Sequence, residues 1–276
     1  MEYWNHIYEH FNPVAFTFIV PVHWYGLMYV MALLTSLYMA KWIVKKDYLG
    51  ITKDELDDFF IYVEVGVILG ARLGYILFYD SNTLYYMTHP WQIFNPFSNG
   101  EFIGIRGMSY HGALLGFLLG AYIFSKRTGN SFGKFMDLVA VAVPLGYVFG
   151  RIGNFLNQEL VGRATDVPWG IYVGGVLRHP SQLYEAFLEG IVLFVIVYMY
   201  RKHKRFDGEL LLLYGFAYGI LRAIAEIFRA PDVQIGYICC NAITLGQTLS
   251  LSMTALAVVI WLYISKVRNK QPKPKR

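Results

Sequence analysis

The chain has 276 residues, of which 56% are hydrophobic and only 16% are charged. Soluble domains carry about 25% charged residues, so this composition excludes an ordinary soluble domain and favours a membrane protein. The net charge of +5 is compatible with a nucleic-acid partner, but its distribution along the chain indicates membrane topology and no nucleic acid. The first ten residues lack a basic region and a cleavage site, so we expect no removable signal peptide.

Seven apolar stretches are long enough to cross a bilayer, which takes about 20 helical residues. We therefore predict an all-α integral membrane protein with seven transmembrane helices in a single domain over residues 1–268. A short outer head is expected at about 154–183, and the Lys- and Pro-rich tail at 269–276 is expected to be disordered. The predicted spans lie at about 17–40, 58–79, 107–125, 135–153, 184–200, 209–228 and 243–265.

Lysine and arginine alternate between the two sides of the predicted bundle. Seventeen of the 24 basic residues, including every lysine, follow the first, third and fifth spans or lie in the C-terminal tail. By the positive-inside rule these loops and the C-terminus are cytoplasmic, so the N-terminus is outside. Glycines recur every four residues in several spans, for example Gly66, Gly70 and Gly74, which predicts close helix packing.

The seven remaining basic residues are all arginines, and they lie within spans or on the predicted outer side. Arginine holds phosphate or carboxylate through a planar fork that lysine lacks. This segregation predicts an anion site in the outer half of the bundle. These arginines are Arg72, Arg106, Arg151, Arg163, Arg178, Arg222 and Arg229.

Two arginine-bearing faces are predicted on two helices. Arg151 and Asn154 are one turn apart, and Gln158 joins them if the helix continues that far. Arg222, Glu226 and Arg229 stand at i, i+4 and i+7, which places two arginines and one acid on one face and leaves one positive charge over. The alternative is that these groups form ion pairs and hydrogen bonds that only stabilise the bundle.

His111 opens the third predicted span and is the natural candidate for a general base, although a lone histidine in a helix is often a hydrogen-bonded structural residue. Metal signals are weak, because His6 and His10 lack the glutamate position of a metalloprotease motif. The adjacent Cys239 and Cys240 fit no zinc spacing and are interpreted as small apolar residues. We therefore expect a site without cofactor or metal whose nucleophile comes from a substrate.

The stretch GRIGNFLNQELVGR (150–163) resembles the signature of the bacterial prolipoprotein diacylglyceryl transferases, usually GRIGNFINGELWGR. Leu156, Gln158 and Val161 depart from that form, as does Ala113 after the His-Gly pair. Other matching segments are His23-Trp24-Tyr25-Gly26, GARLGY around Arg72, Ser109-Tyr110-His111-Gly112, RHPSQLYE (178–185) and LRAIAEIFRAPD (221–232).

The resemblance implies an enzyme of the bacterial cytoplasmic membrane with its active site towards the outer side. Its substrates would be phosphatidylglycerol, a membrane lipid, and preprolipoprotein signal peptides with a lipobox cysteine. The diacylglyceryl group would move to the cysteine thiol, forming a thioether and releasing glycerol phosphate.

Carried over by position, the resemblance also assigns roles. Arg151 and Arg222 would hold the phosphate, with Tyr25 nearby. His111 or an arginine-organised water would take the thiol proton. Asn154 and Glu159 would support the site, with Glu159 either serving an arginine or lying on the proton path. Glu226 and Arg229 would shape the site and its opening to lipid.

Two alternatives use the same residues. A non-enzymatic seven-span transporter or receptor for an anionic lipid explains the arginines, but it does not explain His111 together with Asn154 and Glu159. An intramembrane hydrolase needs a serine or cysteine nucleophile paired with a base, and no such pairing is visible in the sequence.

Overall fold

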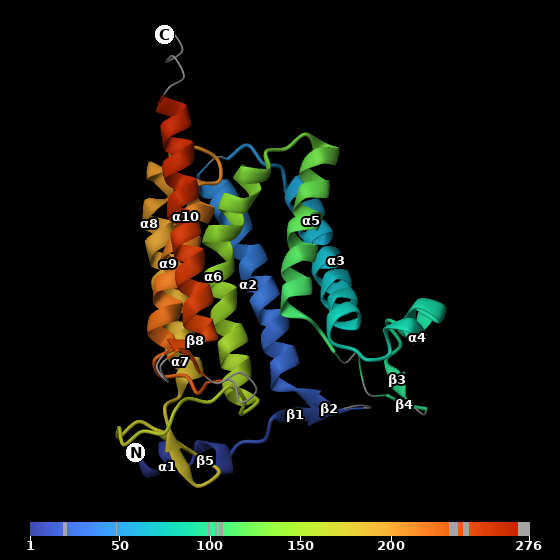
Figure 1. Cartoon of the computed structure of the whole chain (residues 1–276), viewed down its shortest axis with the longest axis vertical. Helices are drawn as coiled ribbons and strands as arrows, with labels where there is room; N and C mark the ends of the chain where they lie inside the picture. The colour runs from blue at the N-terminus through green and yellow to red at the C-terminus, as the bar shows by residue number, and fades with distance from the viewer. Residues whose placement is uncertain are drawn as a thin grey trace. The chain divides into compact units, whose positions relative to one another are not determined.

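The computed structural model describes residues 1–18, 21–47, 49–98, 100–102, 104, 107–231, 237–239 and 243–269. Arg106, Cys240 and most of the predicted tail lie outside the described residues. The chain divides into two compact units, Ile43–Phe135 and Met1–Trp42 with Met136–Arg276 (Figure 1). Membership of both units in one domain over 1–268 stays a prediction.

The unit Ile43–Phe135 is built on two antiparallel helices, α3 (Lys53–Phe78) and α5 (Tyr110–Thr128). A capping box starts α3: the backbone N–H of Glu55 donates to Thr52 Oγ1 at 3.2 Å, and that of Thr52 donates to Glu55 Oε2 at 2.8 Å. Ser109 caps α5. Between the helices lie α4 (Thr83–Thr88), η2 (Pro90–Gln92) and the strands β3 (Phe97–Ser98) and β4 (Glu101–Phe102).

Backbone contact between α3 and α5 explains the glycine rows of this unit. A Cβ built on Gly116 would lie 1.9 Å from the carbonyl oxygen of Gly66, and one on Gly70 would lie 2.3 Å from that of Gly112. No residue with a side chain fits at such distances without moving a helix. The predicted close packing through small residues is therefore confirmed for these two helices.

Arg72 on α3 makes hydrogen bonds to the segment that connects α3 to α5. Its side chain is buried, with Nε donating to the carbonyl of Ile93 at 2.5 Å and Nη1 to that of Gly107 at 3.2 Å. The guanidinium also lies 5.4 Å from the ring centroid of Tyr86. Arg72 therefore ties the segment between α3 and α5 to its own helix.

The other unit contains the remaining helices, except that the last residues of α2 and the first of α6 fall in the range Ile43–Phe135. Figure 1 shows α8, α9 and α10 side by side. Its helical elements are α1 (Glu2–Asn5), η1 (Ile7–Glu9), α2 (Trp24–Lys46), α6 (Phe132–Leu156), α7 (Ser181–Glu185), the π-helix η3 (Ala186–Val192), α8 (Leu193–Tyr200), η4 (Arg201–His203), α9 (Glu209–Ala225) and α10 (Leu245–Asn269). Three antiparallel pairs join β1 (Val14–Thr17) to β2 (Pro21–His23), β5 (Ile171–Val173) to β6 (Val176–Arg178), and β7 (Tyr237–Cys239) to β8 (Ile243–Thr244).

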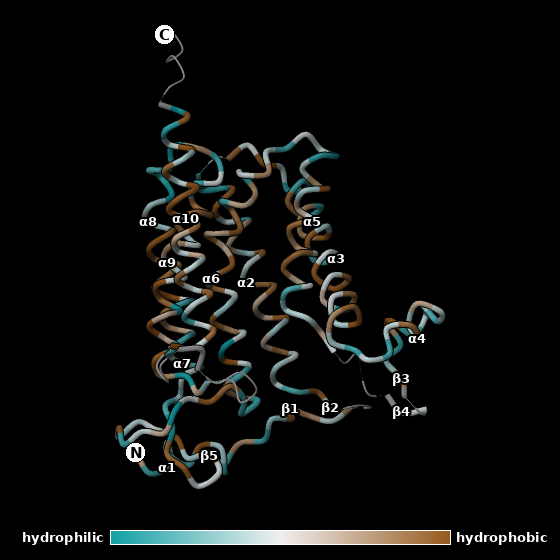
Figure 2. Tube along the Cα trace, viewed as in Figure 1, coloured by the Kyte–Doolittle hydropathy of each residue, from teal (hydrophilic) through white to brown (hydrophobic). Residues whose placement is uncertain are grey.

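The chain is a mostly helical, multi-pass membrane protein. Figure 2 shows hydrophobic residues along most of the long helices. Among the described residues, five helical segments are long and apolar enough to cross a bilayer: Trp24–Lys46, Lys53–Phe78, Phe132–Leu156, Ser181–His203 and Leu245–Arg268. Helices α5 and α9, with 19 and 17 residues, occupy the third and sixth predicted ranges.

The start of the first predicted span differs from the structure. The helix begins at Trp24, whereas the prediction placed its start at residue 17. The preceding residues form the β1–β2 pair instead. Pro21 gives the physical reason, because a proline inside a helix removes a hydrogen bond and clashes with the preceding turn.

A buried aspartate fixes α9 against α6. Asp137 accepts backbone hydrogen bonds from Gly208 at 3.0 Å, Leu210 at 2.8 Å and Leu211 at 3.2 Å, and its carboxylate lies 3.0 Å from Lys204 Nζ. It thereby satisfies N–H groups that have no partner within the first turn of α9. This contact sets the start of the helix that carries Arg222.

Candidate active site

Arg151 on α6 makes the first set of contacts in a buried polar cluster. Its Nε lies 2.8 Å from Glu185 Oε2 and donates to the hydroxyl of Tyr147 at 2.6 Å. Its Nη1 donates to Asn154 Oδ1 at 3.2 Å. The predicted one-turn pairing of Arg151 with Asn154 is therefore confirmed. The cluster also includes Glu189, whose carboxylate accepts a hydrogen bond from Tyr147.

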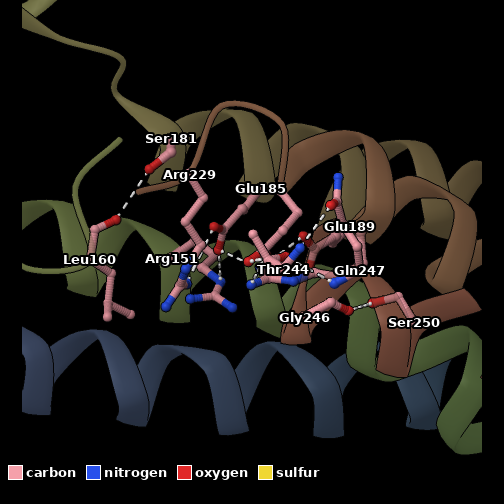
Figure 3. Close-up of polar contacts among 12 residues, drawn as sticks. Arg151, Leu160, Ser181, Glu185, Glu189, Arg229, Thr244, Gly246, Gln247 and Ser250 are labelled. Atoms are coloured by element: carbon pink, nitrogen blue, oxygen red, sulfur yellow. Dashed lines mark hydrogen bonds and ion pairs between the residues drawn. The ribbon is translucent and has the colours of Figure 1, made fainter. Parts of the chain in front are cut away.

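Arg222 on α9 reaches the same glutamates. Its Nη1 lies 3.1 Å from Glu185 Oε2 and 3.3 Å from Glu189 Oε1. Its Nη2 lies 2.7 Å from Glu226 Oε2, so these two residues on one helical face form the i, i+4 ion pair that the alternative interpretation expects. Figure 3 shows Glu185 and Glu189 within this cluster.

Arg229 belongs to the cluster, but it lies outside the helix in which it was predicted. Helix α9 ends at Ala225, so Arg229 does not continue the helical face. Its backbone instead bridges Gly162, and Arg163 Nε donates to the carbonyl of Arg229 at 2.8 Å. Its Nη1 still lies 3.5 Å from Glu185 Oε1 (Figure 3).

The charge of the cluster corrects the sequence prediction. Arg222, Glu226 and Arg229 alone leave one positive charge over, but Arg151, Glu185 and Glu189 complete a set of three arginines and three glutamates. The cluster is therefore balanced in formal charge.

The exposed fractions of its arginine and glutamate side chains nevertheless differ. The side chains of Arg151, Arg222 and Arg229 are 15%, 13% and 11% exposed, whereas those of Glu185 and Glu189 are 0% exposed. The three arginines are thus mostly buried but keep some accessible surface, whereas Glu185 and Glu189 keep none. Guanidinium forks bind phosphate and carboxylate groups, so arginines with accessible surface can bind an anion.

Asn154 links Arg151 to Glu159. Its Nδ2 donates to Glu159 Oε1 at 2.7 Å while its Oδ1 accepts from Arg151. Helix α6 ends at Leu156, so Gln158 does not extend the helical face of Arg151. Gln158 has a φ of 58° and turns outward, and its Nε2 donates to the carbonyls of Tyr8 at 3.2 Å and Phe11 at 3.0 Å.

Tyr25 stands on the first turn of α2, in the same unit as the arginines. Its side chain is 43% exposed, and a Cβ built on Gly153 would lie 3.3 Å from its ring. Since Gly153 precedes Asn154, Tyr25 lies beside the Arg151–Asn154 end of α6. The structure therefore brings seven predicted site residues into one unit: Tyr25, Arg151, Asn154, Glu159, Arg222, Glu226 and Arg229.

Comparison with known proteins assigns this chain to a family. The family model described as prolipoprotein diacylglyceryl transferase matches residues 13–263. The chain belongs to this family. It is 62% identical over 264 residues to a phosphatidylglycerol–prolipoprotein diacylglyceryl transferase of Wolinella succinogenes, covering 95% of this chain and 97% of the relative.

Two further relatives carry the same name. The chain is 61% identical over 270 residues to the protein of Campylobacter jejuni, covering 97% of this chain and 99% of the relative. It is 54% identical over 268 residues to that of Aliarcobacter butzleri, covering 97% and 98%.

His111, the remaining predicted site residue of this family member, lies in the unit Ile43–Phe135. It is exposed on the first turn of α5, beside the ring of Tyr110, and has no hydrogen-bond partner among the described residues. A groove of about 540 Å³ runs beside it and is lined by residues of α3 and α5, including Gly70, Gly74 and Leu115.

Sequence reasoning missed three residues of the cluster: Tyr147, Glu185 and Glu189. Glu185 ends the matched segment RHPSQLYE but received no role, and Glu189 follows four residues later within an apolar run. Two acids at i, i+4 in a membrane helix are a signal that could have identified them. Within the described ranges, no group of three metal-binding side chains converges, and the expectation of a site without metal or cofactor stays a prediction.

Proposed function

We propose that this protein transfers the diacylglyceryl group of phosphatidylglycerol to the lipobox cysteine of preprolipoproteins. The bond between the glyceryl carbon and the phosphate oxygen breaks, a thioether forms at the cysteine sulfur, and glycerol phosphate leaves. Family membership supports the reaction. The convergence of Arg151 and Arg222, which keep some accessible surface, on one buried cluster is the observation that carries the proposal, because both the lipid and the leaving group are anions.

In this proposal Arg151 and Arg222 bind the phosphate. As the carbon–oxygen bond breaks, negative charge grows on the phosphate, and preorganised guanidinium groups stabilise it without reorganisation. Asn154 holds Arg151 through the contact already described, and Glu159 supports Asn154 in turn. Tyr25 lies at the phosphate-binding end, while Glu226 and Arg229 shape the site and its opening to lipid.

His111 is proposed as the base for the incoming thiol. A free cysteine has a pKa of about 8.5, so its proton must be removed at neutral pH before the sulfur attacks. The exposed position of His111 on the first turn of α5, in the lining of the groove, supports this role. An arginine-organised water remains the alternative base.

The deciding experiment is diacylglyceryl transfer from phosphatidylglycerol to a lipobox peptide, read as a mass shift. We expect transfer by the wild-type protein and none by His111→Asn or Arg151→Ala, with both variants folded in detergent. The matched controls His203→Asn and Arg201→Ala should retain transfer. Binding of the lipid without transfer by the wild type would support the receptor or transporter alternative, and full activity of Arg151→Ala would reject the phosphate site.

We also propose seven membrane crossings in the bacterial cytoplasmic membrane, with the N-terminus and active site on the outer side. The positive-inside distribution supports this orientation. Residues 1–268 then form one transmembrane domain with a short outer head at about 154–183 and a disordered cytoplasmic tail at 269–276. A cysteine placed at Lys202, with Cys239 and Cys240 replaced, should be labelled only from the cytoplasmic side. Labelling from outside contradicts the orientation.

A further inference from the structure

Glu185 has the central place in the arginine cluster but no role in the reaction proposed above. Its Oε2 lies 2.8 Å from Arg151 Nε and 3.1 Å from Arg222 Nη1, and its Oε1 lies 3.5 Å from Arg229 Nη1. These arginines come from α6, from α9 and from the segment after α9. One carboxylate therefore joins α6 to α9 and to the segment that follows α9.

The burial of Glu185 restricts what it can do. Its side chain is 0% exposed, so an approaching lipid does not contact it directly. Among the described residues its Oε2 accepts no hydrogen bond, so it holds Arg151 and Arg222 as an ion-pair partner. Opposite charges at these distances attract strongly inside a protein, which allows one carboxylate to orient several guanidinium groups. Glu185 thus acts on a bound anion only through the arginines.

We propose that Glu185 is the positioning residue of the phosphate site, setting the mutual orientation of Arg151, Arg222 and Arg229 before the lipid arrives. This inference rests on the proposed transfer reaction. The same carboxylate has a second, opposite effect, because its negative charge beside the arginines repels the phosphate. Glu185 thus improves the geometry for bond breaking and weakens the ground-state affinity for the anionic lipid.

Glu189 does not share this position. It contacts Arg222 and Tyr147, whereas Glu185 contacts all three arginines. The π-helix η3 begins at Ala186, directly after Glu185, and π turns are frequent at functional sites. Gly190 in η3 permits the close approach to α6, because a Cβ there would lie 2.3 Å from Val148 Cγ2.

The test uses the full-length protein in detergent or vesicles, with steady-state transfer measured over a range of phosphatidylglycerol concentrations. Glu185→Gln keeps the shape of the side chain and removes its charge. Glu185→Asp keeps the charge and shortens the side chain, so it cannot reach all three arginines at the observed distances. Glu209→Gln is the matched control, because Glu209 is also 0% exposed and ion-paired with an arginine, Arg205, at the opposite end of α9.

For Glu185→Gln we expect kcat to fall by about 10²-fold, since a misplacement of about 1 Å has that effect on a catalytic group. Its KM for phosphatidylglycerol should fall by roughly three- to tenfold because one repelling charge is gone. For Glu185→Asp we expect a similar fall in kcat with an unchanged KM. Glu209→Gln should leave both constants within about twofold of the wild type, because it lies about 20 Å along the helix from Arg222.

Wild-type kcat in folded Glu185→Gln or Glu185→Asp, or a KM that rises in Glu185→Gln, overturns the inference. If Glu185→Gln does not fold, Glu185→Asp decides, and failure of both to fold assigns Glu185 a purely structural role. Lipid binding is measured in parallel as the rise in melting temperature with phosphatidylglycerol. Binding without transfer by the wild type rejects the proposed function, whereas the effect of Glu185 on lipid affinity is still read from the same titration.

Discussion

The contact between α3 and α5 predicts a large effect from a single added methyl group at Gly116. In Gly116→Ala the new Cβ would lie 1.9 Å from the carbonyl oxygen of Gly66, about 1.5 Å short of the 3.4 Å at which ordinary contact begins. The position of the Cβ is fixed by the backbone of α5 and the oxygen belongs to the backbone of α3, so no side-chain rotation relieves the overlap. The helices must separate, and the nearby contact of Gly70 with Gly112 loosens with them.

The expected loss of stability follows from two opposing terms. Overpacking a tight interface costs typically about 1–3 kcal/mol. Replacing glycine by alanine in a helix recovers about 1 kcal/mol of helix propensity. Because the clash is with backbone, we expect the upper part of the first range and a net loss of about 2 kcal/mol. Gly215→Ala on α9 is the control, since its Cβ would lie an ordinary 3.6 Å from Ala257.

The assay is unfolding in mixed micelles of increasing SDS content, followed by circular dichroism at a helix wavelength. Gly116→Ala should unfold at a lower SDS fraction than the wild type, and Gly215→Ala at an equal or higher one. Equal midpoints for Gly116→Ala and wild type would refute the argument that backbone contact holds α3 to α5.

Two further predictions concern helix starts. Asp137→Asn removes the charge that pairs with Lys204 and weakens the hydrogen-bond acceptor for the first turn of α9. Breaking a buried ion pair costs about 3–5 kcal/mol of stability. Because Lys204 is 25% exposed and also pairs with Asp207, we expect a smaller loss of about 2 kcal/mol in the same SDS assay. The surface variant Asp207→Asn should lose less than about 1 kcal/mol, and equal midpoints for the two variants would contradict the role of Asp137. Thr52→Ala removes the capping box of α3 and should lower the stability by about 1 kcal/mol. The control is Thr128→Ala, because the Thr128 hydroxyl donates only to the carbonyl of Phe124 in the preceding turn, and its loss of stability should be smaller. A larger loss in Thr128→Ala than in Thr52→Ala would argue against the cap.

The helices could be located from the sequence because a membrane helix is recognised by its own local run of apolar residues. An apolar run of about 20 residues has few alternatives in lipid, where every backbone polar group must be satisfied within the segment. Helices are found in all seven predicted ranges. The start of α2 was wrong by seven residues, because hydropathy continues through Pro21 and Val22 although proline interrupts the helix.

The site was predicted in part for the same reason. Arg151 and Asn154, and Arg222 and Glu226, are pairs within one turn, so their proximity follows from helical geometry alone. The contact of Arg229 with Glu185 does not follow from helical geometry. Helix α9 ends before Arg229, whose backbone forms a bridge with Gly162.

The residue pattern along the chain is enough to predict a helical membrane protein in which seven arginines lie apart from the lysine-bearing loops. The partners of those arginines in the cluster follow only from the fold. Glu185 and Glu189 approach them from a third helix, a non-local arrangement that no spacing rule encodes. Within this cluster, which has no net formal charge, the arginines keep some accessible surface and Glu185 and Glu189 keep none.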